Sequence, residues 1–506
     1  MYRVATFIRF NWPVLAITLV GTAAMLATAG QYGMHRDEMY FVIAGRHPDF
    51  GYVDQPPLTP LLSAFEVQLF GASAFALRIA ATIAYAVVVF LAAVIARAFG
   101  GGRGAQTVAA LTVACSGWIA AAHLDSTTTY DIVGWTVFLA VLIRALNGGD
   151  RRLWLAAGLV AGVTLQDKDL ILFLAVGLAA GALLSRRWDL LRSRWVWAGL
   201  AIALAIWLPN LIWQAANDWP QLEMSRVIAA RDGDSNRSSL ILIQILLAGP
   251  LLFPIFVAGL WWLLRSQEAK PWRMIGWSYL VVVAVLFVTK GKGYYNAGLI
   301  PAITAAGSVP VARWLSSGRP WAGRPWLMWG KRATYAVATV LSALVIVAIA
   351  LPIVPAADFP KSDVAKENSD AVSTYGWPSF VDQVTAVSRS LSPTDRQHAY
   401  ILTGNYGEAG ALQLLGAADL PPVYSGHNSY WSWGPPDDSR TISIVVMGWE
   451  GTGDYFSQYL GPCKLAARVD LGFPPDISEE QDAGIWICRD RTLPWSQIWP
   501  LFRHFS

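Results

Sequence analysis

The chain has 506 residues, of which 55% are hydrophobic and only 14% are charged. Soluble globular chains carry about 25% charged residues, so this composition excludes a purely soluble protein and indicates a membrane protein. The 25 Trp and 17 Tyr are of the types that favour the headgroup level of a bilayer. The net charge of +4, from 38 basic and 34 acidic residues, is too small to indicate nucleic-acid binding.

Apolar runs of about 17 to 25 residues are long enough to cross a bilayer as helices, and they predict about eleven transmembrane helices. The expected spans are 13–30, 74–98, 104–122, 131–146, 153–166, 170–185, 195–213, 239–264, 273–289, 296–314 and 333–354. The runs at 131–146 and 153–166 are short, so we expect these helices to be tilted or covered by neighbours. The first span has a basic start without a small-residue cleavage site, which predicts a retained signal anchor.

Lys and Arg occur in every second connection between these spans, and short cytoplasmic loops retain such residues. The basic set comprises Arg3 and Arg9; Arg97 and Arg103; Arg144, Arg151 and Arg152; Arg186, Arg187, Arg192 and Arg194; Arg265, Lys270 and Arg273; and Arg313, Arg319, Arg324, Lys331 and Arg332. The remaining connections, at 31–73, 123–130, 166–169, 214–238 and 290–295, are therefore expected outside the cytoplasm, as is the chain after residue 355.

The last 150 or so residues differ from the rest, because their apolar runs are of strand length and alternate with Pro, Gly and Asp. Runs at Ala399–Thr403, Ile442–Met447 and Gly484–Cys488 predict a small soluble α/β domain at 356–506, outside the membrane, after a transmembrane domain at 1–355. An oxidising compartment would let Cys463 and Cys488 form a disulfide. The alternative is two buried thiols in one domain.

The first outer loop gathers charge directly after a span, which marks a candidate functional site. Its charged and titratable residues are His35, Arg36, Asp37, Glu38, Arg46, His47, Asp49 and Asp54. Apolar residues recur at helical spacing in 39–44 and 58–70, so we expect short helices that lie along the membrane interface within 31–73.

Polar residues also occur in three further outer connections. Asp125 and Asp131 flank a run of hydroxyl residues, Lys168 lies between two carboxylates, and KGKGYY contains Lys290, Lys292, Tyr294 and Tyr295. The simpler readings are that Asp131 begins a helix and that the lysines extend to lipid headgroups. Together, carboxylates suit a general base and lysines suit a departing phosphate, which predicts an enzyme that takes a sugar from a lipid-linked phosphate.

Four stretches carry a family resemblance: HRDEMYF at 35–41, GYVDQPPLTPLL at 51–62, KGKGYY at 290–295, and NYGEAGALQLLG with PPVYSGHNSYWSWGP across 405–435. They resemble bacterial members of glycosyltransferase family 39, relatives of the protein O-mannosyltransferases and the lipid A aminoarabinose transferases. The resemblance implies a multi-helix membrane fold of the GT-C type. It also implies an inverting transferase that moves a sugar from a polyprenyl-phosphate donor to a cell-envelope glycan, lipid or protein, at the outer face of the bacterial cytoplasmic membrane.

The resemblance also implies roles for single residues. Asp37 matches the first acid of the family's Asp-Glu pair and is the expected general base, with Glu38 positioning the acceptor or Asp37. The residues expected at the donor phosphate or sugar are Arg36, Lys168, Lys290, Lys292, Tyr294 and Tyr295. The candidates for an acceptor pocket are His35, Tyr52, Asp54, Gln55, Asp125, Asp131, His427, Asn428 and Tyr430. No cofactor besides the lipid-linked sugar is expected, and no ligand spacing predicts a metal site.

Two of these assignments have structural alternatives. The Pro-Pro pair after Asp54 and Gln55 suits a simple turn, and the aromatic run around His427 suits a packed core as well as sugar stacking. Eukaryotic relatives insert a luminal domain where this chain has only 214–238, so the acceptor need not be a protein. The competing functions are a glycan transporter, whose signature would be inverted repeats, and a catalytically inactive glycan-binding scaffold.

Overall fold

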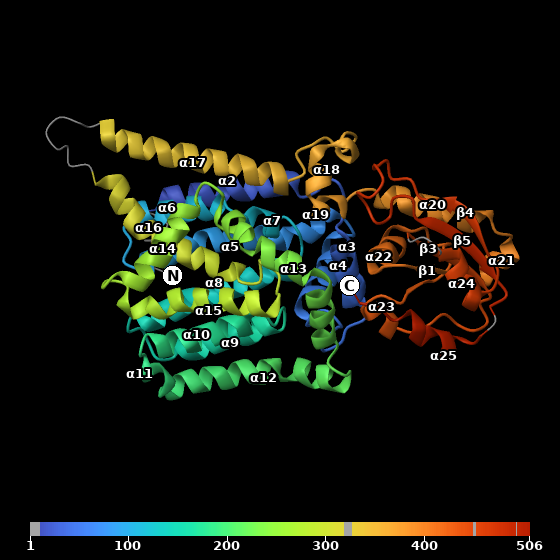
Figure 1. The fold of residues 1–506 in the computed structure, drawn as a ribbon, viewed down its shortest axis with the longest axis horizontal. Helices are drawn as coiled ribbons and strands as arrows, with labels where there is room; N and C mark the ends of the chain where they lie inside the picture. The colour runs from blue at the N-terminus through green and yellow to red at the C-terminus, as the bar shows by residue number, and fades with distance from the viewer. Residues whose placement is uncertain (1–10, 318–325, 449–451, 492, 506) are drawn as a thin grey trace. The chain divides into compact units, whose positions relative to one another are not determined.

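The computed structural model describes residues 11–317, 326–448, 452–491 and 493–505. The chain forms two compact units (Figure 1). The first consists of Met1–Ala29, Arg78–Trp219 and Ile228–Leu351, and the second of Gly30–Leu77, Pro220–Val227 and Pro352–Ser506. The expected boundary at 355/356 lies close to the end of the first unit. The first outer loop, which we expected to belong to the membrane domain, is part of the second unit.

The first unit is helical, and each predicted span coincides with one or two helices. Its elements, including the portions of α5 and α13 that extend into the second unit, are α2 (Trp12–Thr28), α5 (Ala74–Ala98), α6 (Arg103–Ala114), α7 (Trp118–Ala122), α8 (Thr127–Leu146), α9 (Leu153–Leu165), α10 (Ile171–Leu184), α11 (Trp188–Leu191), α12 (Arg194–Ala216), α13 (Pro220–Ala248), α14 (Phe253–Arg265), η1 (Lys270–Trp272), α15 (Arg273–Thr289), η2 (Ala297–Leu299), α16 (Ile300–Ser316) and α17 (Trp326–Ala350).

Within the described residues, five helices are long and apolar enough to cross a membrane singly: Ala74–Ala98, Thr127–Leu146, Arg194–Ala216, Lys270–Thr289 and Met328–Ala350. The expected span at 239–264 is divided between α13 and α14, which meet at a bend of 98°. Gly249, with φ of 91°, lies at this bend in a backbone conformation that residues with a Cβ atom rarely adopt. The bent pair makes a sixth candidate span.

Two further differences concern connections. The expected span at 104–122 is interrupted between α6 and α7, where Cys115 ends α6. The outer connection expected at 214–238 is helical from Pro220 onward. Proline suits the first turn of a helix because its fixed φ is helical and it lacks a donor that would go unpaired. The polar sequence that follows has no apolar periodicity, so the sequence did not predict this helix.

Small residues allow the helices of the first unit to approach one another closely. A Cβ atom on Gly158 of α9 would lie 2.0 Å from the carbonyl oxygen of Gly199 in α12. A Cβ atom on Gly307 of α16 would lie 1.9 Å from a carbonyl oxygen of α14. Close backbone approach at small residues is typical of helix packing in membranes, where van der Waals contact contributes much of the association.

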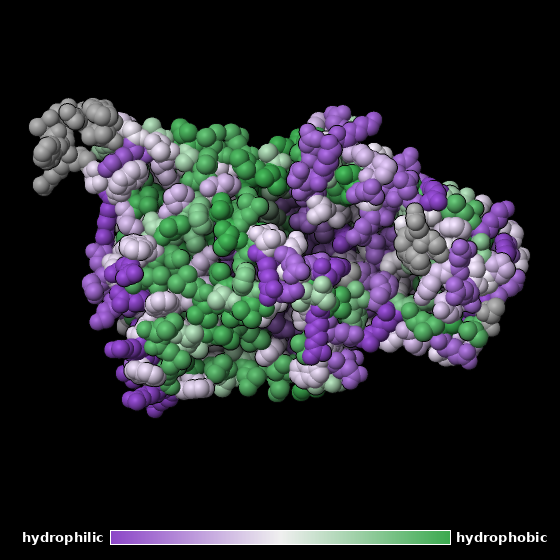
Figure 2. Space-filling model, viewed as in Figure 1, coloured by the Kyte–Doolittle hydropathy of each residue, from purple (hydrophilic) through white to green (hydrophobic). Residues whose placement is uncertain are grey.

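The first unit exposes large hydrophobic side chains, as a protein in contact with lipid does. On α12 these are Trp197, Leu200, Leu204, Leu208 and Ile212. Figure 2 shows hydrophobic residues over α15, α10, α9 and α12, and hydrophilic residues at the end of this unit where α11 lies. In water such a surface would associate or aggregate, whereas in a bilayer it replaces lipid–lipid contacts.

Connections of the basic set contact one another in the first unit. The Asn147 amide donates to the carbonyl of Ala98 at 2.7 Å, and its Oδ1 accepts from the indole of Trp272 at 2.8 Å. Further contacts join Arg187 to the Pro271 carbonyl at 3.0 Å and Arg313 to Glu268 at 2.8 Å. The alternation of basic connections along the sequence is thus also a clustering in space. Arg3, Arg9, Arg319 and Arg324 lie outside the described residues.

The second unit begins with α3 (Arg36–Arg46) and α4 (Leu58–Phe70), the two short helices expected in the first outer loop. Its C-terminal part contains η3 (Phe359–Lys361), α18 (Asp363–Glu367), α19 (Ser369–Val372), α20 (Trp377–Ser390), α21 (Pro393–Gln397), β1 (Ala399–Thr403), α22 (Tyr406–Leu415), β2 (Val423–Ser425), α23 (Ser429–Ser432), β3 (Ile442–Met447), α24 (Thr452–Leu460), β4 (Cys463–Arg468), β5 (Gly484–Arg489), α25 (Trp495–Ile498) and η4 (Trp499–Phe502).

The strands form a five-stranded sheet in the order β2-β1-β3-β5-β4, in which β1 is parallel to β2 and β3. Alternate side chains of β1 enter two different cores. Ile401 packs with residues of α20 and α22 on one face, while Tyr400 and Leu402 pack with Phe456, Trp495 and other residues on the opposite face. This arrangement fits the expected α/β domain and its three expected strands, and it adds β2 and β4.

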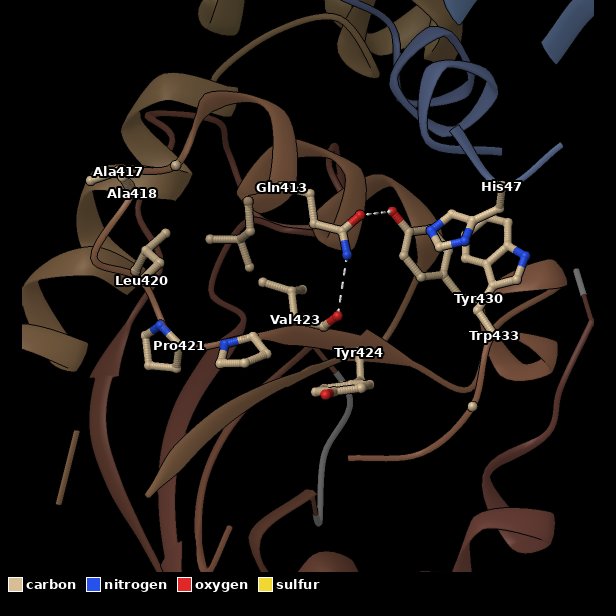
Figure 3. Close-up of a pocket in the computed structure, with 14 residues that line it drawn as sticks. His47, Gln413, Ala417, Ala418, Leu420, Pro421, Val423, Tyr424, Tyr430 and Trp433 are labelled. Atoms are coloured by element: carbon tan, nitrogen blue, oxygen red, sulfur yellow. Dashed lines mark hydrogen bonds between the residues drawn. The ribbon is translucent and has the colours of Figure 1, made fainter. Parts of the chain in front are cut away.

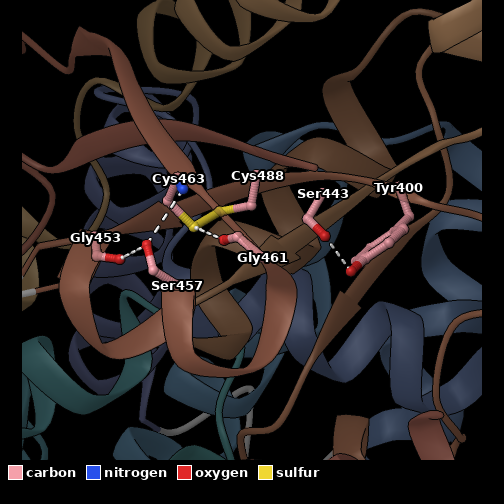
Figure 4. The surroundings of a disulfide bond; sticks show 7 residues. All are labelled: Tyr400, Ser443, Gly453, Ser457, Gly461, Cys463 and Cys488. Carbon is pink, nitrogen blue, oxygen red and sulfur yellow. Dashed lines mark hydrogen bonds between the residues drawn. A yellow bond between two sulfur atoms is a disulfide. The ribbon is translucent and has the colours of Figure 1, made fainter. Parts of the chain in front are cut away.

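The two cysteines of this domain lie opposite each other on neighbouring strands. Cys463 of β4 is the register partner of Cys488 of β5, and the two form a disulfide (Figure 4). The bond joins an edge strand of the sheet to its neighbour. The third cysteine, Cys115, is a free thiol at the end of α6.

Candidate functional site

The site in the second unit begins where two parallel strands end. β1 ends at Thr403, and Tyr406 follows as the first residue of α22. β2 ends at Ser425, and His427 and Asn428 follow. Because β1 and β2 are parallel neighbours, their carboxyl ends lie at one edge of the sheet, where α/β proteins usually bind ligands. This topology explains why Tyr406 and His427 meet, with ring centroids 4.8 Å apart.

Helix α3 packs against α22 and contributes its N-terminal end to the same edge. Gly407 and Gly410 permit this approach because they lack a Cβ atom. A Cβ atom on Gly407 would lie 2.7 Å from Cβ of Arg36, and one on Gly410 would lie 3.1 Å from Cβ of Met39. The helix start is fixed by a capping box, in which Glu38 accepts from the His35 backbone N–H at 2.7 Å. Glu38 is completely buried, so its carboxylate serves to cap the start of α3.

Asp37 differs from Glu38 in its environment. Its Oδ1 accepts a 2.7 Å hydrogen bond from the hydroxyl of Tyr406, and 38% of its side chain remains exposed. Arg36 forms an ion pair with Glu479 at 2.9 Å and lies over the Tyr406 ring, 5.7 Å from its centroid. Asp37 is thus both oriented by a phenol and open to a reactant, which is what a general base requires.

A second carboxylate, Asp54, belongs to the same group of residues. Its Oδ1 accepts from the Tyr40 hydroxyl at 2.9 Å, and its Oδ2 accepts from the Asn428 amide at 3.2 Å. Burial raises the pKa of Asp54 to about 7; the negative charge of Asp37 raises the pKa as well, while the two donors oppose the shift. Asp54 therefore changes protonation near neutral pH.

Tyrosine rings connect the two carboxylates. The rings of Tyr40 and Tyr406, which donate to Asp54 and Asp37 respectively, lie 4.8 Å apart between centroids. Asn428 has φ of 48°, a strained value for a residue with a Cβ atom that is more frequent for Asn than for most residues. Strain of this kind is concentrated at functional sites and is maintained by the surrounding structure.

The remaining acceptor-pocket candidates of this unit have mainly structural contacts. The hydroxyl of Tyr52 donates to the carbonyls of Ala44 and His47. Tyr52 N–H also donates to the Gln55 carbonyl, which closes the turn expected from the Pro-Pro pair. Gln55 is buried, and its side-chain Nε2 has no hydrogen-bond partner within the described residues. Tyr430 donates to Gln413 at 3.0 Å.

The first unit brings together a different subset of the predicted residues. Lys168 Nζ donates to Thr128 Oγ1 at 2.9 Å, and it lies 5.7 and 5.9 Å from the ring centroids of Tyr294 and Tyr295. Three of the connections that the sequence predicts outside the cytoplasm therefore meet at the ammonium group of Lys168. A lysine framed by hydroxyl and aromatic groups is suited to a phosphate, which it would bind as a point charge.

The two predicted carboxylates of the first unit, Asp125 and Asp131, have hydrogen-bond donors within that unit. Asp125 is fully buried and accepts from the Tyr130 hydroxyl at 2.5 Å. Asp131 lies inside α8 and accepts from the Trp135 indole at 2.9 Å. Ser126, and not Asp131, caps α8 with its side chain, so the alternative interpretation of Asp131 as a helix start is wrong.

The other two lysines of KGKGYY are placed differently from Lys168. Lys290 forms an ion pair with the exposed carboxylate of Asp234 at 3.0 Å. Lys290 has a left-handed backbone with φ of 58° at the end of α15, which directs the chain into this turn. Lys292 has Asp232 within electrostatic range.

Sequence reasoning did not identify Tyr40, Tyr406, Thr128 and Tyr130 as site residues. Tyr40 lies one helical turn after Asp37 in HRDEMYF, and Tyr406 lies in the NYGEAG stretch, so both were within the motifs. The hydrogen-bond partners of these hydroxyl groups lie on other segments of the chain or depend on the local fold, so the sequence does not identify them. Among the residues that the structure describes, no three His, Cys, Asp or Glu side chains are grouped as metal ligands would be.

Comparisons with known proteins agree with this architecture. Residues 54–213 match the family model described as dolichyl-phosphate-mannose-protein mannosyltransferase. No curated protein sequence matches the chain.

Solved structures are similar over most of the chain. The structure of ArnT from Cupriavidus metallidurans bound to undecaprenyl phosphate is 17% identical, with a TM-score of 0.58 over 95% of this chain and 98% of that chain. Its apo form is 14% identical, with a TM-score of 0.59 over 96% and 98%. The oligosaccharyltransferase of Archaeoglobus fulgidus, tethered to an acceptor peptide with an NVT sequon, is 12% identical, with a TM-score of 0.53 over 82% and 64%. At these low sequence identities, the similarity shows a shared fold only.

Proposed function

We propose that the chain is a membrane glycosyltransferase of the GT-C type that transfers a sugar from a polyprenyl-phosphate donor to an acceptor of the cell envelope. The fold shared with ArnT and the match of residues 54–213 to the mannosyltransferase family model support this proposal. The observation that carries this proposal is the pair Asp37 and Tyr406, in which a partly exposed carboxylate is oriented by a phenol. ArnT was solved with undecaprenyl phosphate, a donor carrier of the chemical class proposed here.

Asp37 is the proposed general base. An acceptor hydroxyl or amine attacks the anomeric carbon of the donor sugar, and its proton passes to the Asp37 carboxylate. The new bond to the anomeric carbon forms as the bond from that carbon to the phosphate oxygen breaks, and the lipid phosphate leaves with the bonding electrons. Attack from the face opposite the phosphate inverts the anomeric configuration.

Asp54 and Glu38 have different proposed roles. Asp54, between Tyr40 and Asn428, is proposed to hold the acceptor through its remaining lone pairs. Glu38 is buried and caps α3, so it positions Asp37 by fixing the start of the helix. Neither residue is assigned the proton transfer.

Lys168 is the proposed partner of the donor phosphate. Positive charge stabilises the phosphate as negative charge develops on its leaving oxygen. Tyr294 and Tyr295, whose rings face Lys168, are proposed to hold the sugar or the lipid neck. Lys290 and Lys292 have smaller proposed contributions, because Lys290 already has an ion pair with Asp234.

The proposed location is the bacterial cytoplasmic membrane, with the C-terminal domain and the reacting groups outside the cytoplasm. Two observations support this orientation: the basic connections contact one another in the first unit, and short basic loops are retained in the cytoplasm. The Cys463–Cys488 disulfide suits an oxidising compartment.

The experiment uses membranes that contain either the intact protein or the Asp37→Asn variant, incubated with radiolabelled polyprenyl-phosphate hexoses and pentoses. We expect label to enter one envelope fraction only with the intact protein. A folded protein that binds the lipid but consumes no donor would contradict the proposal and favour a glycan-binding scaffold. Donor that crosses the membrane without transfer would indicate a transporter.

A further inference from the structure

The second unit contains a pocket that none of the proposed catalytic groups lines. Its volume is about 430 Å³, within the range of small-molecule sites, which is roughly 300–1,000 Å³. His47, at the end of α3, forms one part of its wall, and residues 412–434 form the rest (Figure 3). We propose that this pocket binds a neutral sugar unit of the acceptor, remote from the unit that receives the transferred sugar.

Aromatic rings form one side of the pocket. Trp433 stacks on His47 with centroids 4.5 Å apart and contacts Tyr430 edge to face at 4.7 Å. In Figure 3 these three rings lie together on one side of the pocket, and the ring of Tyr424 lies below it. Amphipathic aromatic rings offer apolar faces to the C–H surfaces of a sugar and polar edges to its hydroxyls.

Polar groups of the pocket retain hydrogen-bonding capacity. Gln413 accepts from Tyr430 at 3.0 Å and donates to the Val423 carbonyl at 3.2 Å. A carboxamide has two N–H groups and two acceptor lone pairs, so one of each remains. The Tyr424 hydroxyl and the His47 ring nitrogens add further donors and acceptors with no hydrogen-bond partner in the described chain. Several adjacent donors and acceptors suit a polyhydroxyl ligand.

The charge of the side chains that line the pocket indicates which class of ligand it can bind. None of the described lining residues is Asp, Glu, Lys or Arg. Burial lowers the pKa of His47 below its ordinary value, which favours the neutral imidazole. A lining without charge disfavours a phosphate or a carboxylate, which require Arg, Lys or backbone nests. A neutral saccharide is therefore the favoured ligand.

The position of the pocket within the second unit distinguishes it from the reacting end of the site. Asp37 is near the start of α3 and His47 directly follows its last residue. Ten residues of helix at 1.5 Å each span about 15 Å, which is longer than one sugar ring. Tyr430 connects the two regions, because its ring lines the pocket and lies 6.1 Å from the ring of Tyr40. An acceptor that occupies both regions is thus an oligosaccharide or the glycan of a glycolipid.

This inference rests on the proposed function, but binding can be measured without transfer. Purified full-length protein in lipid nanodiscs is titrated with neutral linear trisaccharides of glucose, galactose, mannose, arabinose or N-acetylglucosamine, followed by saturation-transfer NMR. The variants are Trp433→Ala and Ala418→Trp, the second of which fills the pocket from an exposed lining position. The matched control is Tyr459→Ala, a half-buried aromatic residue of the same unit that does not line the pocket.

We expect at least one trisaccharide to bind the intact protein, and both pocket variants to weaken it about tenfold, with no change in Tyr459→Ala. Ala418→Trp keeps the test decisive if Trp433→Ala fails to fold. No binding of any trisaccharide, binding unaffected by Ala418→Trp, or preferential binding of a peptide or a phosphorylated sugar would overturn the inference.

The two proposals fail in different ways. Binding that persists in Asp37→Asn, together with no transfer by the intact protein, would refute the proposed function and leave the sugar pocket. If the intact protein and the Ala418→Trp variant transfer sugar at equal rates at every acceptor concentration, the sugar pocket is refuted and the transferase function stands.

Discussion

The hydroxyl of Tyr406 donates a 2.7 Å hydrogen bond to Oδ1 of Asp37, between residues 369 positions apart in the chain. Tyr406 is the first residue of α22 and follows β1 after a two-residue connection. Asp37 is the second residue of α3, which packs on α22. The central sheet of the C-terminal domain therefore orients a carboxylate contributed by the segment at 31–73. This relationship makes the C-terminal domain part of the proposed chemistry.

Replacing Tyr406 by Phe should reduce the transfer rate while the protein remains folded. The change removes only the hydroxyl, and hydrogen bonds to charged groups contribute about 1.5–3 kcal/mol. We expect kcat to fall by roughly tenfold or more, with donor affinity unchanged. The measurement is transfer under saturating donor, with donor affinity measured separately.

Tyr32→Phe is the matched control for that variant, because Tyr32 is a tyrosine of the same unit whose hydroxyl donates to a backbone carbonyl, that of Val354. Its kcat should match that of the intact protein. Equal rates in Tyr406→Phe and the intact protein would show that the phenol does not assist Asp37.

Asp54 predicts a pH dependence of stability. Burial raises the pKa of this carboxyl to about 7 in the folded protein, whereas in an unfolded chain it is about 4. Between these values the folded state binds the extra proton, so stability falls as pH rises from about 4 toward 7. Asp54→Asn cannot ionise and should lose less stability over this interval. Thermal unfolding at pH 5 and pH 8 tests this, and parallel changes in Tm for both proteins would contradict it.

The lysine assignments predict an effect on binding more than on chemistry. Lys168→Ala and Lys292→Ala should weaken the affinity for a polyprenyl phosphate, by about tenfold for Lys168, because a charge-assisted contact to phosphate is lost. The control is Lys366→Ala, whose exposed ammonium pairs only locally with Asp363. Unchanged donor affinity in both site variants would remove these lysines from the donor site.

The disulfide should stabilise the C-terminal domain. It closes a loop with a sequence separation of 25, for which the loss of unfolded-chain entropy corresponds to about 3.5 kcal/mol. We expect Cys463→Ser to lower the Tm of this domain with little effect on the rate of transfer at low temperature. Mass analysis of a non-reduced digest reports the bond directly, and two free thiols at Cys463 and Cys488 would contradict it.

Much of the fold was predictable, because hydrophobic periodicity is local. The apolar runs became helices, and the three expected strands became β1, β3 and β5. The errors occurred where tertiary context decides the outcome. The polar first half of α13 has no apolar stripe, and the bend before α14 depends on the backbone freedom of Gly249. The short strand β2 is defined by its pairing with β1 more than by its own sequence.

The candidate site was predictable only in part. Motif resemblance led to Asp37, Asp54 and Asn428, which the structure brings together within the second unit. Their connecting tyrosines were not predicted, since the partner of a hydroxyl depends on contacts between distant segments. The sequence also did not distinguish the roles of Asp37 and Glu38, because an acidic pair does not reveal which of its members is buried as a helix cap.

The role of Asp37 as the base is tested most directly by measuring donor binding and transfer together in Asp37→Asn, reconstituted in liposomes with the polyprenyl-phosphate sugar that the intact protein consumes. The substitution keeps the size of the side chain and an acceptor oxygen for Tyr406 but removes the basic carboxylate. We expect unchanged donor affinity and transfer reduced to background. Transfer at the rate of the intact protein would contradict the assignment of Asp37 as the base.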